Sequence, residues 1–312
     1  MRVLVTGLSG FVGRWLLPAL TARSHEVTGT RLPTESDPDL SGVAGWRPLD
    51  LTDAATVGAA LEPCPEAVIH LAAVASGAEA RRDPGRAYEV NTAGTARLAE
   101  VLGQRRAAGT GDPLLLLVST AEVYGAGDAR LPRRETDSPA PVSPYAASKL
   151  AAEIAAQEVA RRTGLRLIIV RPFPHTGPGQ TDRYVIPALA HRLRAARRAG
   201  ETRVAAGNLD PVRDYLDVRD VAAAYAGLLE HGRAGDLYNV ASGEGRSLHD
   251  LFLQLARLTG VAATPVPDPA LFRQADLMHL VGDPTRLRAR TGWTPRISFD
   301  QTLQDVVDAQ TD

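Results

Sequence analysis

The chain has 312 residues, and its 35 basic and 36 acidic side chains leave a formal net charge of −1. This balance, with the arginines scattered along the chain, gives no reason to expect a nucleic acid or a membrane surface as partner. The single cysteine, Cys64, cannot form an intramolecular disulfide, and no signal peptide precedes the first strand pattern, so we expect a cytoplasmic protein with a small soluble ligand.

Short apolar strands alternate with helices through the first half of the chain. Strand patterns occur at 2–6, 26–30, 67–72, 114–119 and 166–171, and helical patterns occur at 11–23, 53–61, 85–108 and 144–164. This alternation predicts an α/β fold with a Rossmann-type, doubly wound parallel sheet that helices cover on both faces. The longest aliphatic run, "LLLLV" at 114–118, has the length of a buried strand and is too short to span a bilayer.

The pattern changes after Arg171, where prolines and glycines cluster and strands no longer alternate regularly with helices. We therefore predict two parts. The first is a dinucleotide-binding domain, 1–171, whose sheet is completed by about 203–241, including a strand at 237–241. The second is a smaller C-terminal substrate-binding lobe, built from 172–202 and 243–312.

The segment "TGLSGFVG" at 6–13 places Gly7, Gly10 and Gly13 between the first strand and the first helix. Glycines in this pattern permit a tight turn, close approach of the backbone to a pyrophosphate, and close helix packing. The helix N-terminus, with Phe11 and Val12 in its first turn, favours negative charge. We predict a dinucleotide site here, the alternative being an ordinary turn from strand to helix.

The end of the second strand indicates which dinucleotide binds. NAD sites usually carry an acidic residue there for the ribose 2′-hydroxyl, whereas this chain has Thr30 and Arg31. Arginine suits a 2′-phosphate, so we expect NADPH rather than NADH, although Arg31 as a plain surface charge is the alternative. Asp50 and Leu51 are expected to flank the adenine, and Asp53 is equally compatible with simple helix capping.

Tyr145 and Lys149 are spaced i, i+4 on a predicted helix, so their side chains share one face. Lys149 is the only lysine in the chain, which otherwise uses arginine for every positive charge. A compact ammonium can lie under a nicotinamide ribose and favour the tyrosinate, whereas the broad guanidinium fork does not fit in the same way. The alternative is a lysine that survives by chance beside an ordinary tyrosine.

Four segments together resemble the extended short-chain dehydrogenase/reductase family of nucleotide-sugar enzymes: "TGLSGFVG", "HLAA" at 70–73, "STAEVYG" at 119–125 and "YAASK" at 145–149. The resemblance implies that Thr120 hydrogen-bonds the substrate oxygen and that Tyr145, with Lys149 as its partner, is the general acid or base. It also places Asn91 at a position that shapes the central helix and orders the site. The cofactor-binding residues expected from these segments include Leu71, Ala72 and Ala73.

The second half of the chain is most similar, within that family, to GDP-6-deoxy-D-mannose reductases. This similarity implies that Arg213 binds the diphosphate, which suits a bidentate guanidinium, and that Arg273 and Asp276 lie around phosphate and ribose. His175 lies in the same loop as Pro174, which stands where the family has an asparagine. Gln274 stands where proline is usual. These departures leave a dTDP-linked 4-keto-6-deoxyhexose open as the alternative substrate.

Glu122 leaves the reaction type open, because the similar GDP-mannose 4,6-dehydratases use a glutamate at this place to remove a proton from carbon. Chain length and the "HTGPGQ" loop at 175–180 favour an NADPH-dependent ketoreductase over a dehydratase, an epimerase or a cofactor-sensing protein. No metal-ligand cluster is expected, since His175 has no companion ligands. Family members pair their central helices, so we expect a homodimer built on 85–108 and 144–164.

Overall fold

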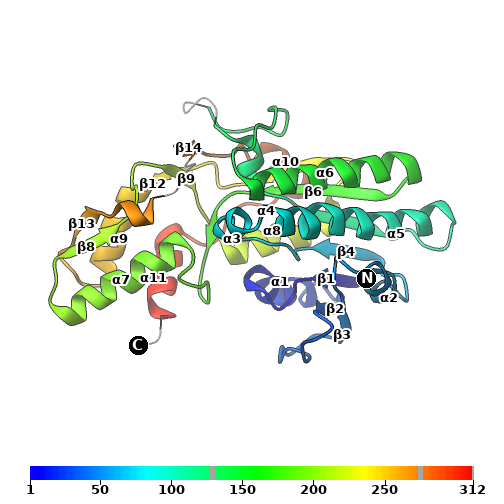
Figure 1. Cartoon of the computed structure of the whole chain (residues 1–312), viewed down its shortest axis with the longest axis horizontal. Helices are drawn as coiled ribbons and strands as arrows, with labels where there is room; N and C mark the ends of the chain where they lie inside the picture. The colour runs from blue at the N-terminus through cyan, green and yellow to red at the C-terminus, as the bar shows by residue number, and fades with distance from the viewer. Residues whose placement is uncertain (127–130, 273–276, 311–312) are drawn as a thin grey trace.

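The computed structural model describes residues 1–126, 131–272 and 277–310. Seven parallel strands form its central sheet in the order β11-β6-β5-β4-β1-β2-β3 (Figure 1). Their bounds are β1 (Arg2–Thr6), β2 (Glu26–Arg31), β3 (Gly45–Pro48), β4 (Ala67–His70), β5 (Leu114–Val118), β6 (Arg166–Pro172) and β11 (Leu237–Val240). The predicted Rossmann-type parallel sheet is therefore confirmed.

Alternate residues of these strands point to opposite faces, and each face has its own apolar core. Val3 and Ile69 belong to one core, together with helices α1 (Phe11–Thr21) and α8 (Val218–His231). Leu4 and Val68 belong to the other, where α2 (Ala54–Ala60), α5 (Thr95–Ala107) and α6 (Pro144–Thr163) pack. Burial on both faces explains why the strands read as continuous apolar runs rather than as an alternation.

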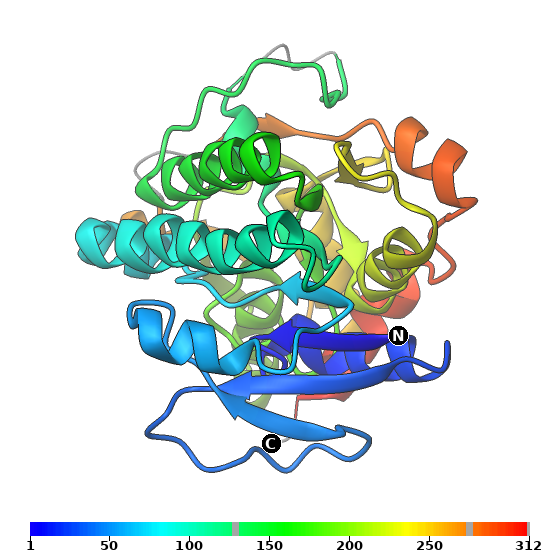
Figure 2. The same cartoon turned by 90° about the vertical axis from the view of Figure 1, so that its right-hand side faces the viewer.

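The helix expected over 85–108 is divided into three segments. These are α4 (Pro84–Tyr88), a π-helical segment η1 (Glu89–Gly94) and then α5, which lies beside α6 (Figure 1 and Figure 2). The hydroxyl of Thr95, the first residue of α5, donates to the carbonyl of Asn91 in η1 at 2.6 Å, which gives that carbonyl a side-chain partner. Such π-bulges often occur at functional sites.

The remaining elements gather mainly at one end of the molecule (Figure 1). Helices α7 (Val185–Ala199), α9 (Leu248–Leu258) and α11 (Phe299–Asp308) share an apolar core with β8 (Arg203–Ala206), which pairs with β13 (Thr264–Pro267). Three other short strands form a sheet of their own: β9 (Val212–Asp214), β12 (Gly245–Ser247) and β14 (His279–Leu280). The shorter elements are α3 (Gly77–Arg82), η2 (Ala121–Tyr124), β7 (His175–Thr176), β10 (Leu216–Asp217), η3 (Pro269–Leu271) and α10 (Thr285–Thr291).

The stretch 203–241 returns to the sheet only in part. β11 adds the seventh strand and α8 covers one face, whereas β8 and β9 lie in separate small sheets. β8 stays outside because Val204 and Ala206 are buried in the core around α7 and α9. Among the described residues, we find no helix that combines the length and apolar character needed to cross a membrane.

Candidate active site

A cavity of about 1340 Å³ opens where the carboxyl ends of the central strands meet the C-terminal elements. Ligands of doubly wound sheets bind at this edge. The cavity is lined by most of the residues predicted from sequence, namely Gly7, Gly10, Phe11, Val12, Gly13, Thr30, Arg31, Asp50, Leu51, Leu71, Ala72, Ala73, Thr120, Glu122, Tyr145, Lys149, Pro174, His175 and Arg213. Asn91 lies outside its lining, and Arg273 and Asp276 lie outside the described residues.

The glycine loop at the start of α1 fits a pyrophosphate. Gly7 has φ +71°, and a Cβ there would lie 3.0 Å from the Ala72 nitrogen. A Cβ on Gly13 would lie 2.3 Å from the Leu8 carbonyl oxygen, so the helix can start this close to the strand only with glycine. Among the described residues no side chain caps the helix at Gly10, and its first turn holds no acidic residue. The free backbone N–H groups and the dipole at the N-terminus of α1 therefore favour an anion.

Arg31 and Thr30 use their polar atoms differently. The Gly7 N–H donates to the Thr30 hydroxyl at 3.4 Å, so Thr30 supports the glycine loop. Arg31 ends β2 and lines the cavity, and its Nε donates to Asp37 at 2.5 Å. A ligand phosphate at this position would compete with Asp37 for the guanidinium.

Asp50 and Leu51 lie at the carboxyl end of β3, where the cavity continues. The Asp50 carboxylate accepts both the backbone N–H and the hydroxyl of Thr52, at 2.9 and 2.7 Å, and these bonds lower its pKa. Leu51 is almost fully buried. Asp53 caps α2 by accepting from the Ala55 N–H, which settles the open question of its capping role.

Thr120, Glu122, Tyr145 and Lys149 come together at the end of β5 and the start of α6. Ser143 caps α6 through the Ala146 N–H, so Tyr145 and Lys149 lie in the first two turns on one face. The Thr120 hydroxyl accepts from the Glu122 N–H at 3.2 Å, and it lies close enough to the Tyr145 phenol to affect its pKa. The structure therefore brings the four predicted catalytic side chains to one wall of the cavity.

Burial away from solvent changes the pKa of both predicted catalytic groups on α6, Tyr145 and Lys149. It raises the pKa of the Tyr145 phenol, the negative charge of Glu122 raises that pKa further, and the Thr120 hydroxyl lowers it. It lowers the pKa of Lys149 to about 8, while the charge of Glu153 acts in the opposite direction. Tyr145 is thus a phenol that keeps its proton at neutral pH.

Asn91 is buried behind the cavity wall rather than in it. Its side chain accepts from the Val74 N–H at 2.8 Å and donates to the Val74 carbonyl at 3.1 Å and to the Ser148 hydroxyl at 3.0 Å. These bonds tie the loop after β4, which lines the cavity, to the helix that carries Lys149. Asn91 therefore links the cavity-lining loop to α6 without forming the surface of the cavity.

Two further predicted substrate residues, His175 and Arg213, line the cavity from β7 and β9. The ring of His175 stacks on that of Phe11 with an interplanar angle of 2°, and its Nδ1 lies 3.0 Å from the Phe173 carbonyl. Arg213 on β9 is only 8% exposed, and its guanidinium donates to the Val212 carbonyl at 3.0 Å. Within the described part of the chain, no group of three or more His, Cys, Asp or Glu side chains could hold a metal ion.

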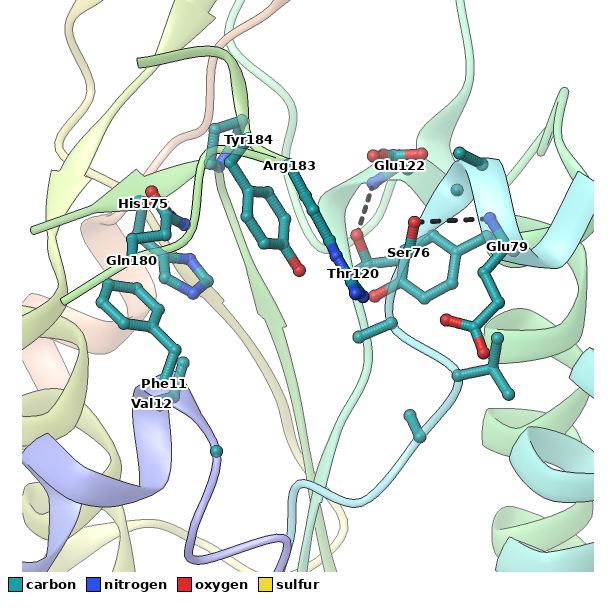
Figure 3. Close-up of a pocket in the computed structure, with 18 of the residues that line it drawn as sticks. Phe11, Val12, Ser76, Glu79, Thr120, Glu122, His175, Gln180, Arg183 and Tyr184 are labelled. Atoms are coloured by element: carbon teal, nitrogen blue, oxygen red, sulfur yellow. Dashed lines mark hydrogen bonds between the residues drawn. The ribbon is translucent and has the colours of Figure 1, made fainter. Parts of the chain in front are cut away.

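Several residues that line the cavity were not named as site residues from the sequence, among them Ser76, Glu79, Gln180, Arg183 and Tyr184. Figure 3 shows Arg183 and Tyr184 pointing into the space between His175 and Thr120, with Glu79 on the far side. Gln180 hydrogen-bonds Thr176 at 2.7 Å and so shapes the loop after β7. The only available signal was the position of Arg183 and Tyr184 just after the glycine- and proline-rich stretch that follows Arg171.

Comparison with known proteins identifies the group to which this site belongs. A model of the NAD dependent epimerase/dehydratase family matches residues 3–241. GDP-6-deoxy-D-mannose reductase from Pseudomonas aeruginosa is 37% identical over 98% of this chain and 96% of its own. UDP-glucose 4-epimerase from Mycolicibacterium smegmatis is 31% identical over 99% of this chain and 98% of its own. The solved structure of RMD from Pseudomonas aeruginosa, complexed with NADPH, superposes with a TM-score of 0.85 at 35% identity, covering 99% of this chain and 98% of that one.

Proposed function

Because the chain belongs to the NAD dependent epimerase/dehydratase family, we propose that it is an NADPH-dependent 4-ketoreductase of a nucleotide-linked 4-keto-6-deoxyhexose. We propose GDP-4-keto-6-deoxy-D-mannose as the substrate and a GDP-6-deoxyhexose as the product. The match to the Pseudomonas aeruginosa GDP-6-deoxy-D-mannose reductase over nearly the whole of both chains supports the proposed substrate. The similar solved structure of RMD, which is complexed with NADPH, supports the proposed cofactor. NADH is the less favoured cofactor, because Arg31 stands where NAD sites carry an acid.

One observation carries this proposal: a protonated phenol, Tyr145, lies beside the Thr120 hydroxyl in the cavity that the glycine loop enters. Reduction of a ketone builds negative charge on the carbonyl oxygen and then needs one proton. The Tyr145 phenol holds such a proton at neutral pH, and its burial, which raises its pKa, favours the protonated form further.

Each catalytic side chain has a role in this reaction. The glycine loop and Arg31 would hold NADPH, which would supply the hydride when bound. The Thr120 hydroxyl, which accepts from the Glu122 N–H, would turn its proton from the Tyr145 phenol to the substrate carbonyl oxygen. Tyr145 gives its phenolic proton to the same oxygen as charge develops there. Lys149 holds the ribose hydroxyls and stabilises the tyrosinate that remains.

We propose that residues 1–171 with β11 form the cofactor domain, and that 172–202 and 243–312 form the nucleotide-sugar lobe. Arg213, nearly buried at the cavity wall, is suited to a diphosphate because its planar guanidinium can donate two parallel hydrogen bonds. Pro174 lines the cavity but offers no side-chain donor, so the diphosphate depends more heavily on Arg213.

The deciding experiment follows NADPH absorbance with GDP- and dTDP-linked 4-keto-6-deoxyhexoses in parallel, with Tyr145→Phe as the inactive control. We expect rapid oxidation of NADPH with the GDP-linked sugar. Faster turnover of the dTDP-linked sugar would change the nucleotide but keep the reaction. No NADPH oxidation with either sugar would contradict the proposed substrate class.

We further propose a cytoplasmic homodimer that pairs α5 and α6 with their copies. Apolar side chains are exposed along this region: Ile154 on α6 is 56% exposed and Tyr88 on α4 is 42% exposed. Light scattering at micromolar concentration should give a dimer, and Ile154→Arg should give a monomer, while Glu158→Gln on the same helix should leave the dimer intact. A wild-type protein that is monomeric at this concentration would contradict the proposal.

A further inference from the structure

A third polar side chain continues the catalytic face of α6. Tyr145, Lys149 and Glu153 follow one another at four-residue spacing, so they form one stripe along the helix. Glu153 is 2% exposed and lies beyond the cavity lining. The proposed mechanism gives it no task, although a buried carboxylate is costly to keep.

Glu153 is held from two strands. Arg171 on β6 donates to it twice, from Nε at 3.0 Å and from Nη2 at 2.7 Å, and the Ser119 hydroxyl at the end of β5 donates to the same Oε1. The Arg171 guanidinium also lies over the ring of Tyr124, 4.7 Å from its centroid. The carboxylate is therefore held in a fixed orientation by a bidentate guanidinium and a hydroxyl at the centre of the fold.

Stability alone does not explain this pair. Replacing a buried ion pair by apolar side chains of similar volume is often neutral or stabilising, because desolvation offsets the attraction. The surrounding core, with Ala156 and Ile169 fully or almost fully buried, could accept such side chains. A buried charge at this place needs another reason.

Lys149 provides that reason. The residue is only 3% exposed, and burial favours the neutral form of its ammonium. From β4, His70 lies within electrostatic reach but is neutral, since burial lowers its pKa to about 3. Tyr145 keeps its proton, and Arg171 is already paired, so Glu153 is the group that favours a charged Lys149.

We propose that Glu153, fixed by Arg171 and Ser119, is a positioning residue of the active site that keeps the Lys149 ammonium charged. It acts through Lys149 and does not contact substrate. The value of a charged Lys149 rests on the proposed reductase function, but its protonation can be measured without substrate.

The lone lysine makes the test direct. In the full-length protein grown with ¹³C-labelled lysine, the Cε resonance reports only Lys149, and its change with pH gives the pKa of this one ammonium. Glu153→Gln keeps the shape and removes the charge, so we expect the titration midpoint to fall by about one to three pH units. The second variant is the double substitution Glu153→Gln/Arg171→Met, which leaves no unpaired buried cation. Its titration midpoint should fall by less than that of Glu153→Gln, because the nearby positive charge of Arg171 is lost as well.

Two controls separate charge from packing. Ser119→Ala removes a hydrogen bond of Glu153 but leaves its charge, so the midpoint should stay at the wild-type value. Asp220→Asn removes another buried carboxylate, which accepts from the backbone N–H groups of Arg296 and Ile297 on a different element. It should reduce stability without moving the midpoint.

A second readout is the alkaline limb of kcat against pH, which should move to lower pH in Glu153→Gln in step with the Lys149 midpoint. An unchanged midpoint in the folded Glu153→Gln and double variants would overturn the inference. A lowered midpoint in a protein that oxidises no NADPH with either sugar would instead leave the inference standing and remove the proposed function.

Discussion

The two walls of the cavity are assembled in different ways. The cofactor wall comes from neighbouring elements, since the glycine loop follows β1, begins α1 and is held by Thr30 at the end of β2. The side of the cavity that carries Arg213, which we call the substrate wall, is assembled from distant segments. Arg213 lies on β9, and β9 pairs with β12 on one side and with β14 on the other, two strands formed by residues 245–247 and 279–280. Local motifs therefore describe the first wall well, whereas long-range strand pairing decides the second.

This contrast has a consequence for mutation. On the cofactor wall, backbone geometry carries the function, so adding a single methyl group is harmful. On the substrate wall, the proposed function depends on side-chain charge, so we expect removal of the Arg213 guanidinium to weaken binding while the fold remains. Tyr145 is the proposed proton donor, so its loss should affect the reaction more than a change on either wall.

Tyr145→Phe should lower kcat by about 100- to 10,000-fold, because it removes the proton donor but keeps the ring. The KM for NADPH should change little, since the phenol hydroxyl does not contact the pyrophosphate. Stopped-flow measurement of NADPH oxidation checks both values. Activity within tenfold of wild type would show that another group supplies the proton.

Gly13→Ala tests the cofactor wall. Because its Cβ would lie 2.3 Å from the Leu8 carbonyl oxygen, the turn must shift, at a cost of about 1–3 kcal/mol in the free energy of unfolding and with a loss of NADPH affinity. Gly58→Ala on α2 is the matched control, because no heavy atom among the described residues lies within 4 Å of its Cβ and alanine favours a helix. Urea unfolding and fluorescence titration with NADPH should separate the two variants, and equal behaviour would contradict the prediction.

Arg31→Ala and Arg213→Ala should have complementary effects on binding. Each removes charge-assisted hydrogen bonds, so the first should raise the KM for NADPH, and the second the KM for the nucleotide sugar, by about ten- to a hundredfold. The KM for NADH should stay unchanged in Arg31→Ala, because that cofactor has no 2′-phosphate. Steady-state kinetics with both cofactors checks this, and an equal rise for NADH and NADPH would mean that Arg31 does not contact the phosphate.

Glu122→Gln should have the smallest effect, with kcat within about tenfold of wild type, because ketone reduction removes no proton from carbon. The charge of Glu122 raises the pKa of Tyr145, so its loss lowers that pKa. Tyr145 is active below its pKa, and any alkaline limb due to the phenol should therefore move to lower pH. If wild-type protein converts GDP-mannose to its 4-keto-6-deoxy product without net NADPH consumption, and Glu122→Gln abolishes this, the dehydratase mechanism replaces the reductase.

The sequence by itself determined the sheet and the catalytic helix. The strands expected at 2–6, 26–30 and 114–119 match β1, β2 and β5 to within one residue at either end, because apolar runs bounded by turns are local signals. The glycine spacing and the i, i+4 placement of Tyr145 and Lys149 are local as well. Most of the residues named from these patterns line one cavity.

Only the tertiary structure decided what each polar group contacts. It divided the helix over 85–108 by a π-helical segment, placed Asn91 behind the cavity, and paired β8 with β13 outside the main sheet. It also brought Arg171 to Glu153 and so revealed the buried ion pair one helical turn after Lys149. A hydrogen bond or a buried ion pair depends on where two distant segments meet, and no short stretch of sequence records that distance.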